Sequence, residues 1–340
     1  MISNKNMPEK SMINLGSRFF KVWTNRELGP FVLLIILGAT FYYANPAFLS
    51  TMNISNMLAY IPELGIIALG MTMLLTAGEF DLSVGAVFGF TPVLMFVLYN
   101  QHIMSFWAAF LVSIFTAALI GLANGLFVAK VGISSLITTI GMQLIVRGTA
   151  LYITSGFPQK TWETSSWIKT IIDGTVAKVG EFKLLASLFW YIGLAVVLYF
   201  VLNHTRFGNW VMATGGNAKA AKARGINTVR VKIILFVVCA VLAGFAGIMD
   251  ALRIEAAYPI SGTGYELEII AMVVIGGTSL YGGRGTILGT IIGVLLLRVI
   301  RNGIIVVGVP GLAYNIFVGA IIILMMTLYA IFERRQVGED

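Results

Sequence analysis

Long apolar runs recur along nearly the whole chain, and they constrain its fold more than any other feature. Two of them, "LGIIALGMTMLL" and "VGAVFGFTPVLMFVLY", flank a short polar turn. The runs are about 15 to 22 residues long, the length that a helix needs to cross roughly 30 Å of hydrocarbon. They do not alternate apolar and polar residues as the strands of a membrane β-barrel do. Only 11% of the residues are charged, against about 25% in soluble domains. The sequence therefore predicts an all-α polytopic membrane protein.

The spacing of these runs predicts about ten transmembrane helices in one membrane domain over residues 29–332. A basic segment, 1–28, precedes this domain without the apolar core of a cleavable signal, and a short tail, 333–340, follows it. Basic residues gather in segment 1–28, in the loop 204–232 and in the tail, so the positive-inside rule predicts that both termini are cytoplasmic. The net charge of +8 is thus an orientation signal and not a nucleic-acid-binding surface. The expected helices are 30–45, 55–77, 84–99, 106–128, 133–153, 185–203, 232–251, 266–278, 286–301 and 313–332.

Two polar loops are long enough to carry a function. The outer loop, about 154–184, contains the amphipathic piece "SSWIKTII", which predicts an interfacial helix anchored by tryptophan, or else a ledge for an external partner. The inner loop, about 204–232, contains "GGNAKAAKARGI". Asn217 is a good N-cap, alanines favour the helix that follows, and Gly225 is suited to end it. We expect one short basic helix here that lies in a groove of another protein, although an ordinary basic loop is the alternative.

Two further segments interrupt apolar runs. "TAGEFDLSVG" (76–85) places Glu79 and Asp81 between oily stretches, where an ionised carboxylate is costly. We expect Asp81 or Ser83 to cap the helix that begins near Val84 at a shallow cytoplasmic turn, with a direct part in gating as the alternative. "GGTSLYGGRG" (276–285) breaks a later span. Because 70–85 and 271–286 occupy similar places in two halves, we expect a pseudo-repeat whose interruptions mark a transport pathway. The pathway or gating candidates are Glu79, Asp81, Ser83, Thr278 and Ser279.

Catalytic and metal motifs are missing from the sequence. No Gly-x-x-x-x-Gly-Lys-Ser/Thr loop, His-Glu-x-x-His motif or Cys/His cluster occurs, and His102 and His204 are isolated. We therefore expect no catalytic residue, no metal site, no cofactor and no nucleotide site. A pathway for a rapidly moving solute should also lack buried charge pairs, and we expect Glu63, Asp250, Glu266 and Glu268 to lie near span ends.

Three ordered motifs carry a family resemblance that covers nearly the whole chain. "GEFDLSVGA", "ATGGNAKAAKARGI" and "GTGYELEIIAMVVIGGTSLYGGRGTILGTIIGVLLL" resemble the permease subunits of bacterial ABC importers for monosaccharides, the ribose/xylose/galactose group. The group usually has Gly-Gly-Ile-Asp-Leu-Ser-Val-Gly at the first motif, whereas this chain has Glu79-Phe80 in place of Gly-Ile. This departure leaves the expected fold unchanged.

The resemblance implies a fold, a location and partners. The fold would resemble that of vitamin B12-type importers, in the bacterial inner membrane. The partners would be a cytoplasmic ATPase with two fused nucleotide-binding modules, a second permease, identical or paralogous, and a periplasmic sugar-binding protein, with membrane lipid around the spans. The residues that would seat in the ATPase are Gly215, Gly216, Asn217, Ala220, Ala221, Gly225 and Ile226. An ion-coupled secondary transporter of a small polar solute is the alternative function.

Overall fold

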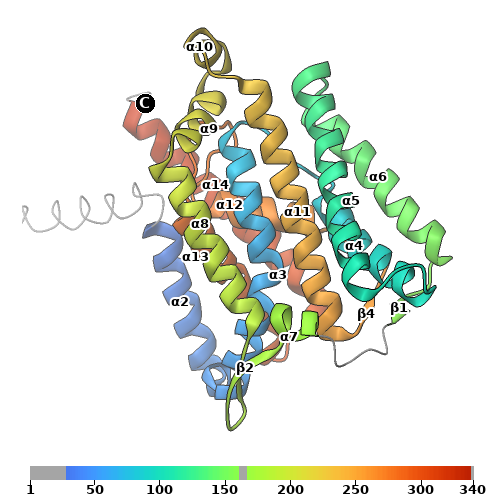
Figure 1. Ribbon diagram of the computed structural model, residues 1–340. Coiled ribbons are helices and arrows are strands. Elements are labelled where there is room, and N and C mark those ends of the chain that lie inside the picture. Colours follow the sequence, from blue (N-terminus) through green and yellow to red (C-terminus); the bar gives the residue numbers. More distant parts are fainter. Residues whose placement is uncertain (1–27, 161–166, 338–340) are drawn as a thin grey trace, which may run out of the picture.

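The computed structural model describes residues 28–160 and 167–337 and is a bundle of helices with short strands at one end (Figure 1). The basic segment 1–28, except its last residue, and the last three residues of the tail lie outside the described part. The elements are α2 (Leu28–Ala44), η1 (Pro46–Leu49), α3 (Thr51–Thr76), α4 (Val84–Asn100), α5 (Phe106–Leu126), η2 (Phe127–Val131), α6 (Ser135–Thr154), β1 (Gln159–Lys160), α7 (Trp167–Asp173), β2 (Thr175–Val179), β3 (Phe182–Leu185), α8 (Ala186–His204), α9 (Arg206–Gly216), α10 (Ala218–Ala223), α11 (Thr228–Ile254), β4 (Ala256–Ala257), α12 (Tyr265–Ile275), α13 (Ile287–Val306), η3 (Gly311–Ala313) and α14 (Tyr314–Val337).

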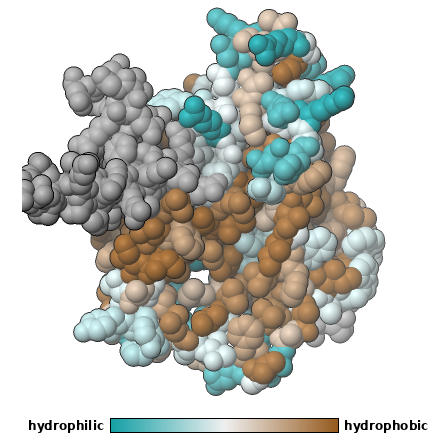
Figure 2. Space-filling view, turned by 90° about the vertical axis from the view of Figure 1, so that its left-hand side faces the viewer, coloured by the Kyte–Doolittle hydropathy of each residue, from teal (hydrophilic) through white to brown (hydrophobic). Residues whose placement is uncertain are grey.

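A helix lies in each of the ten predicted ranges. Six helical segments among the described residues are long and apolar enough to cross a membrane: α3, α5 with η2, α6, α8, α11 and α13. The surface agrees, because Figure 2 shows a broad apolar band between hydrophilic ends. The chain is therefore a polytopic helical membrane protein, whereas the number of ten spans and the likeness to the vitamin B12-type fold stay predictions. We call the two ends of the bundle the α10 end and the α7 end, after the helices that lie there in Figure 1.

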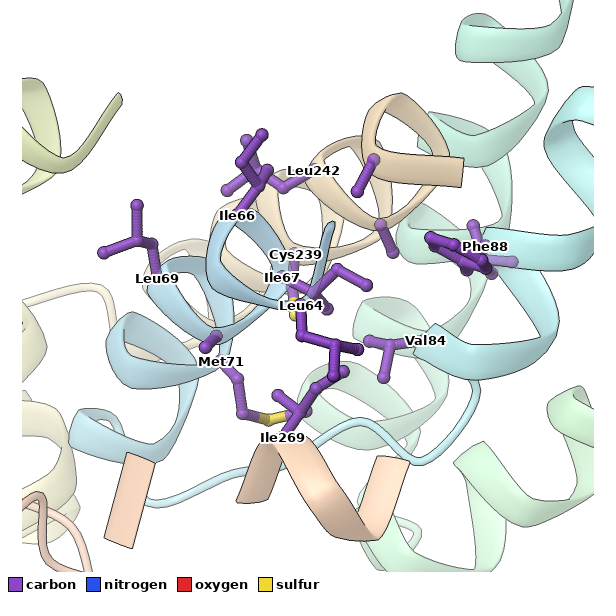
Figure 3. Close-up of a cluster of buried hydrophobic side chains, with 14 of the residues drawn as sticks. Leu64, Ile66, Ile67, Leu69, Met71, Val84, Phe88, Cys239, Leu242 and Ile269 are labelled. Carbon is purple, nitrogen blue, oxygen red and sulfur yellow. The ribbon is translucent and has the colours of Figure 1, made fainter. Parts of the chain in front are cut away.

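Helix α3 forms the centre of the bundle. Ser50 caps its start by accepting the amide of Asn53, and every residue from Ile61 to Thr76 is buried. Figure 3 shows its leucine and isoleucine side chains in one cluster with Phe88 of α4, Cys239 of α11 and Ile269 of α12. An 11-residue helix such as α12 is too short to span the bilayer, so this packing against α3 and α13 fixes its place.

Glycines four residues apart, such as Gly121 and Gly125 of α5, permit close helix contact. A Cβ on Gly121 of α5 would lie 2.5 Å from the Phe236 carbonyl oxygen of α11, and one on Gly125 would lie 2.8 Å from Ile233 Cα. Small residues of this kind let backbones approach where lipid supplies no hydrophobic driving force. Gly85 of α4 likewise lies directly against Gly262, in the segment that joins α11 to α12.

The predicted pairing of 70–85 with 271–286 stays a prediction. Each stretch holds the end of one helix and the break before the next, α3 and α4 in the first and α12 and α13 in the second. A long helix, a break and a shorter helix also occur twice, as α3, 77–83 and α4, and again as α11, 255–264 and α12. These two breaks lead to the contact between Gly85 and Gly262.

The α7 end is covered by the outer loop. Helix α7 lies in the predicted interfacial piece and buries Ile168 and Ile172, while Trp167 packs on Trp107 with ring centroids 5.1 Å apart. Strands β2 and β3 form an antiparallel hairpin, and β1 pairs with β4. These strand pairs were not predicted, since β1 and β4 each contain only two residues. Residues 161–166 of this loop lie outside the described part.

Candidate functional site

Helix α10 has the caps that the sequence predicts. The Asn217 side chain accepts a hydrogen bond from the Ala220 amide at 3.0 Å. At the other end Gly225 has φ +84°, a left-handed conformation that glycine adopts without strain. The Ile226 amide donates to the Ala221 carbonyl at 3.1 Å, and the Gly225 amide donates to Lys222 at 3.0 Å. These two bonds form a Schellman motif, so residues 217–226 are a fully capped single helix.

The exposed face of α10 differs from the predicted one. Ala220 is exposed, but Ala221 is only 3% exposed and packs against the chain itself. Ala221 therefore cannot offer its side chain to a partner. Lys219, Lys222 and Arg224 are exposed beside Ala220 and give this face its positive charge.

The inner loop contains two helices and not one. Helix α9 precedes α10 and ends at Gly216, so Gly215 and Gly216 belong to α9. Thr205 caps α9 by accepting the Gly208 amide at 3.2 Å. Three glycines among its 11 residues lower helix propensity, which is why the sequence did not predict it.

Three segments meet at the α10 end of the bundle. The Gly283 amide donates to the carbonyl of Thr76 at 2.8 Å. A Cβ on Gly215 would lie 2.6 Å from the Gly283 amide nitrogen, and one on Gly282 would lie 2.8 Å from the Cα of Gly78. The turn after α3, the end of α9 and the loop 276–286 are thus in direct backbone contact.

The pathway candidates in the loop 276–286 bond within that loop. Thr278 is buried, and its hydroxyl accepts the Thr286 amide at 3.3 Å. Ser279 accepts the Tyr281 amide through its hydroxyl at 3.2 Å, and its own amide donates to the Arg284 carbonyl at 3.0 Å. Both side chains therefore shape a tight turn in this structure.

Asp81 is fully buried, which corrects the expectation of a shallow turn. Its Oδ1 accepts the Ser83 amide at 2.8 Å and the Ser83 hydroxyl at 2.6 Å, and Oδ2 accepts from Asn124 Nδ2 at 3.2 Å. Asn124 lies seven residues before Val131, where its span ends, so the cluster is about 10 Å inside the bundle. Asp81 fixes the turn before α4, while Ser83 makes no side-chain cap bond.

Glu79 has a partner that the sequence did not reveal. Its Oε1 lies 2.5 Å from Nζ of Lys232, in the first turns of α11. Their side chains are 12% and 22% exposed, so the pair is partly shielded from water. The acidic turn is therefore tied to α11 through Glu79 and to α5 through Asp81.

A buried ionic network joins three spans, contrary to the expectation that buried charge pairs are absent. Glu63 is 4% exposed at the middle of α3 and not near its end. It pairs with Arg253 of α11 and with Arg298 of α13, the latter at 3.3 Å. Arg253 also contacts Asp250 at 2.8 Å and lies over the ring of Tyr60. The position of these carboxylates therefore gives no argument against an ion-coupled secondary transporter.

Arg147 of α6 is a polar anchor that sequence reasoning missed. Its guanidinium donates to the carbonyls of Pro259 at 2.7 Å, Ser261 at 2.5 Å and Gly85 at 3.1 Å. One turn away, Gln143 donates to Oε1 of Glu266 at 3.0 Å. A lone arginine inside the apolar run "LIVRGTALYI" was the available signal.

The polar groups at these places do not form a catalytic or metal centre. Among the described residues, no three His, Cys, Asp or Glu side chains gather as metal ligands would. Glu63 and Glu79 pair with basic side chains, and Asp81 and Glu266 accept hydrogen bonds from side-chain amides. The arrangement can bind helices to one another and move them as units.

Comparison with known proteins identifies the family. Residues 53–326 match the family described as "Branched-chain amino acid transport system / permease component". The chain is 34% identical to the ribose import permease protein RbsC of Escherichia coli (strain K12) over 92% of this chain and 96% of the relative. It is 34% identical to the xylose/arabinose import permease protein XylH of Sulfolobus acidocaldarius, over 94% and 86%. It is also 34% identical to the galactose/methyl galactoside import permease protein MglC of Salmonella typhimurium (strain LT2), over 96% and 100%.

No solved structure matches the chain. The alignments cover 86% to 100% of these relatives, each of which is named as an import permease protein. The chain therefore belongs to the family of ABC importer permeases that includes the ribose, xylose and galactose import permeases, and it is a transport subunit and not an enzyme.

Proposed function

We propose that this chain forms half of the translocation pathway of an ATP-driven importer for a monosaccharide or sugar-like solute. The observation that carries the proposal is the match to ribose, xylose/arabinose and galactose permeases over 92% to 96% of the chain. Three relatives with different sugars are equally identical to it, so the proposal extends to the monosaccharide class and not to one sugar.

The partners follow from the same relatives. The permease would work with a cytoplasmic ATPase that has two fused nucleotide-binding modules and with a periplasmic sugar-binding protein. A second permease, identical or paralogous, would complete the pathway. In this arrangement the α10 end is cytoplasmic, as are both termini, and the outer loop 154–184 at the α7 end faces the binding protein.

Helix α10 is the proposed contact with the ATPase. It is capped at both ends and exposes Ala220 between basic side chains. A small exposed residue on a rigid helix suits close seating in a groove. Within the set predicted for this role, Asn217 and Gly225 would shape the helix, and Gly215 and Ala221 would hold it to the bundle.

The pathway would open by movement of whole helices. ATP must bind one gate state of the complex more tightly than the other, because a ligand shifts only an equilibrium whose states it binds unequally. Gly215 is in contact with Thr76 and Gly283, so displacement of α9 would reach the turns after α3 and α12. Glu79, Asp81, Ser83, Thr278 and Ser279 would then serve the gate as fixed points of those turns.

The energy source tests this function. Permease reconstituted in vesicles with its ATPase and binding protein should import radiolabelled ribose, xylose or galactose only when ATP is present. Without the ATPase, a proton or sodium gradient should drive no uptake. Gradient-driven uptake by the permease alone would refute the proposal in favour of an ion-coupled secondary transporter.

A further inference from the structure

The segment between α11 and α12 is irregular backbone on the surface of the bundle. After β4 the chain runs through turns from residue 258 to 264. Ile260 is 64% exposed and Tyr258 41%, and Thr263 and Gly264 are also exposed. We call residues 258–264 the re-entrant segment.

This segment lies inside the membrane layer and not above it. Arg147, which binds its carbonyls, lies seven residues before the end of α6 at Thr154. Seven residues of helix correspond to about 10 Å. Helix α6 has 20 residues, about 30 Å, which matches the hydrocarbon thickness of a bilayer. The re-entrant segment is thus roughly 10 Å below the α7 end of the hydrocarbon layer.

Lipid cannot cover such a segment. Irregular backbone at membrane depth occurs only where protein buries it or where it lines water, since hydrocarbon offers no hydrogen bonds. Residues 258, 260, 263 and 264 of the segment are exposed in the described part of the chain, whereas Pro259 and Gly262 are buried. Next to it, Oε2 of Glu266 is buried without a hydrogen-bond partner among the described residues, although buried polar atoms normally have one. Both observations favour a polar environment beside the segment, although several of its carbonyls are already bonded within the chain.

The segment is also held firmly in place. Arg147 donates to Pro259, Ser261 and Gly85, and so fixes the segment to the start of α4. Gln143 holds the first turn of α12 through Glu266. The two shorter helices α4 and α12, which follow the breaks 77–83 and 255–264, thus begin beside each other. In transporters, interrupted helices of this kind mark the binding path.

We propose that the re-entrant segment, residues 258–264, lines the water-filled path of the polyhydroxylated solute, with Arg147 as its positioning residue. The inference rests on the proposed function, because it assumes that a solute crosses at this chain. The segment supplies main-chain groups, two glycines and three hydroxyls, those of Tyr258, Ser261 and Thr263. The Thr263 hydroxyl is already bonded to the Ile260 carbonyl. Such sparse hydrogen bonding would let a sugar pass without being retained.

Cysteine labelling tests this placement. The only cysteine, Cys239, is fully buried, so the parent chain provides an unreactive background. Thr263→Cys and Ile260→Cys place a thiol on the re-entrant segment. Ile192→Cys is the matched control, because Ile192 is 50% exposed and lies six residues from the α7 end of α8, about 9 Å by helical rise. Figure 1 shows α8 on the side of the bundle away from α6.

The reagent is a charged, membrane-impermeant methanethiosulfonate, applied to the full complex in vesicles with and without ATP. The reagent reacts with the thiolate form of cysteine, which forms in water and not in hydrocarbon. Both segment variants should therefore react about tenfold or more faster than Ile192→Cys, with ATP, without it, or in both conditions. A saturating transported sugar should slow that reaction several-fold. Rates equal to the control in both states, or rates that no transported sugar changes, would overturn the inference.

ATP-driven uptake by the parent complex, measured in parallel, reports on the proposed function separately. Absence of this uptake rejects the proposed function, whereas normal parental uptake with unreactive segment thiols rejects only the pathway assignment. Two positions are used so that poor assembly of one variant does not decide the result.

Discussion

Tryptophan substitutions at two neighbouring alanines should separate the partner-facing side of α10 from its inner side. Ala220 is exposed, whereas Ala221 is 3% exposed and packs against the bundle. The change is chemically the same at both positions, and tryptophan has a helix propensity within about 0.7 kcal/mol of alanine. Any larger difference between the variants must therefore come from what each side chain meets.

The two substitutions should weaken different equilibria: folding of the permease for Ala221→Trp, and binding of the ATPase for Ala220→Trp. Added volume in a packed contact typically costs about 1–3 kcal/mol. For Ala221→Trp this cost falls on the permease itself and lowers its free energy of unfolding. For Ala220→Trp the isolated permease is unaffected, and the cost appears only when the ATPase binds. A loss of about 1–3 kcal/mol there corresponds to roughly 5- to 150-fold weaker binding.

The assay combines thermal unfolding of the purified permease with binding of its ATPase and sugar-stimulated ATP hydrolysis in vesicles. Ala177→Trp is the control for unfolding and for ATPase binding, because Ala177 is exposed in β2 at the α7 end, and it should change neither of the two. If Ala220→Trp binds and stimulates the ATPase like the parent, α10 is not the docking element and the assignment is wrong.

Three further predictions concern buried carboxylates. Asp81→Asn should retain most transport, because the amide oxygen can still accept the bonds from Ser83. Asp81→Leu should lose about 1–3 kcal/mol of stability, because it leaves a buried amide without an acceptor. If Asp81→Asn folds with normal yield but does not transport, the charge itself is required. Glu63→Gln should lower the free energy of unfolding by about 3–5 kcal/mol, since two buried arginines lose their counter-charge. The control is Glu255→Gln, which should cost below about 1 kcal/mol because the Glu255 side chain is 45% exposed. Equal effects of the two changes on thermal unfolding would refute the role of the network. Burial, with a smaller contribution from the charge of Asp250, raises the pKa of Asp173 to about 7. The folded state therefore binds a proton that the unfolded state releases, and the free energy of unfolding should fall as pH rises from about 4 to 7. Thermal unfolding of Asp173→Asn should lack that part of the pH dependence.

Local features were predictable from the sequence, because their causes lie within a few residues. The caps of α10 are an example, since Asn217 and Gly225 act on amides and carbonyls no more than four residues away. The four-residue spacing of Gly121 and Gly125 in α5 similarly indicates a close helix contact, although the sequence does not name α11 as the neighbour.

Non-local features were missed for the opposite reason. The partners of Glu63 are 190 and 235 residues away along the chain, and nothing near Glu63 indicates them. The same holds for Asp81, whose depth depends on Asn124 of α5. Helix α9 was not predicted because its three glycines have low helix propensity. At least one of them is needed for close packing, since a Cβ on Gly208 would lie 2.5 Å from the Val201 carbonyl oxygen.

The backbone contact at the α10 end explains why glycine recurs in three separate segments. Three chain segments meet at Gly78, Gly215 and Gly282. A Cβ on Gly215 or Gly282 would lie within 3 Å of backbone atoms of a neighbouring segment, and Gly78 has a positive φ of +82°. Atoms in such close packing leave no free space to absorb a shift, so a displacement of α9 must be shared by the turn after α3 and by the loop after α12. The first of these turns leads through Asp81 into α4, whose second residue, Gly85, is bound by Arg147 and lies against the re-entrant segment. A continuous series of direct contacts therefore joins the exposed face of α10 to the membrane-depth segment near the opposite end of the bundle.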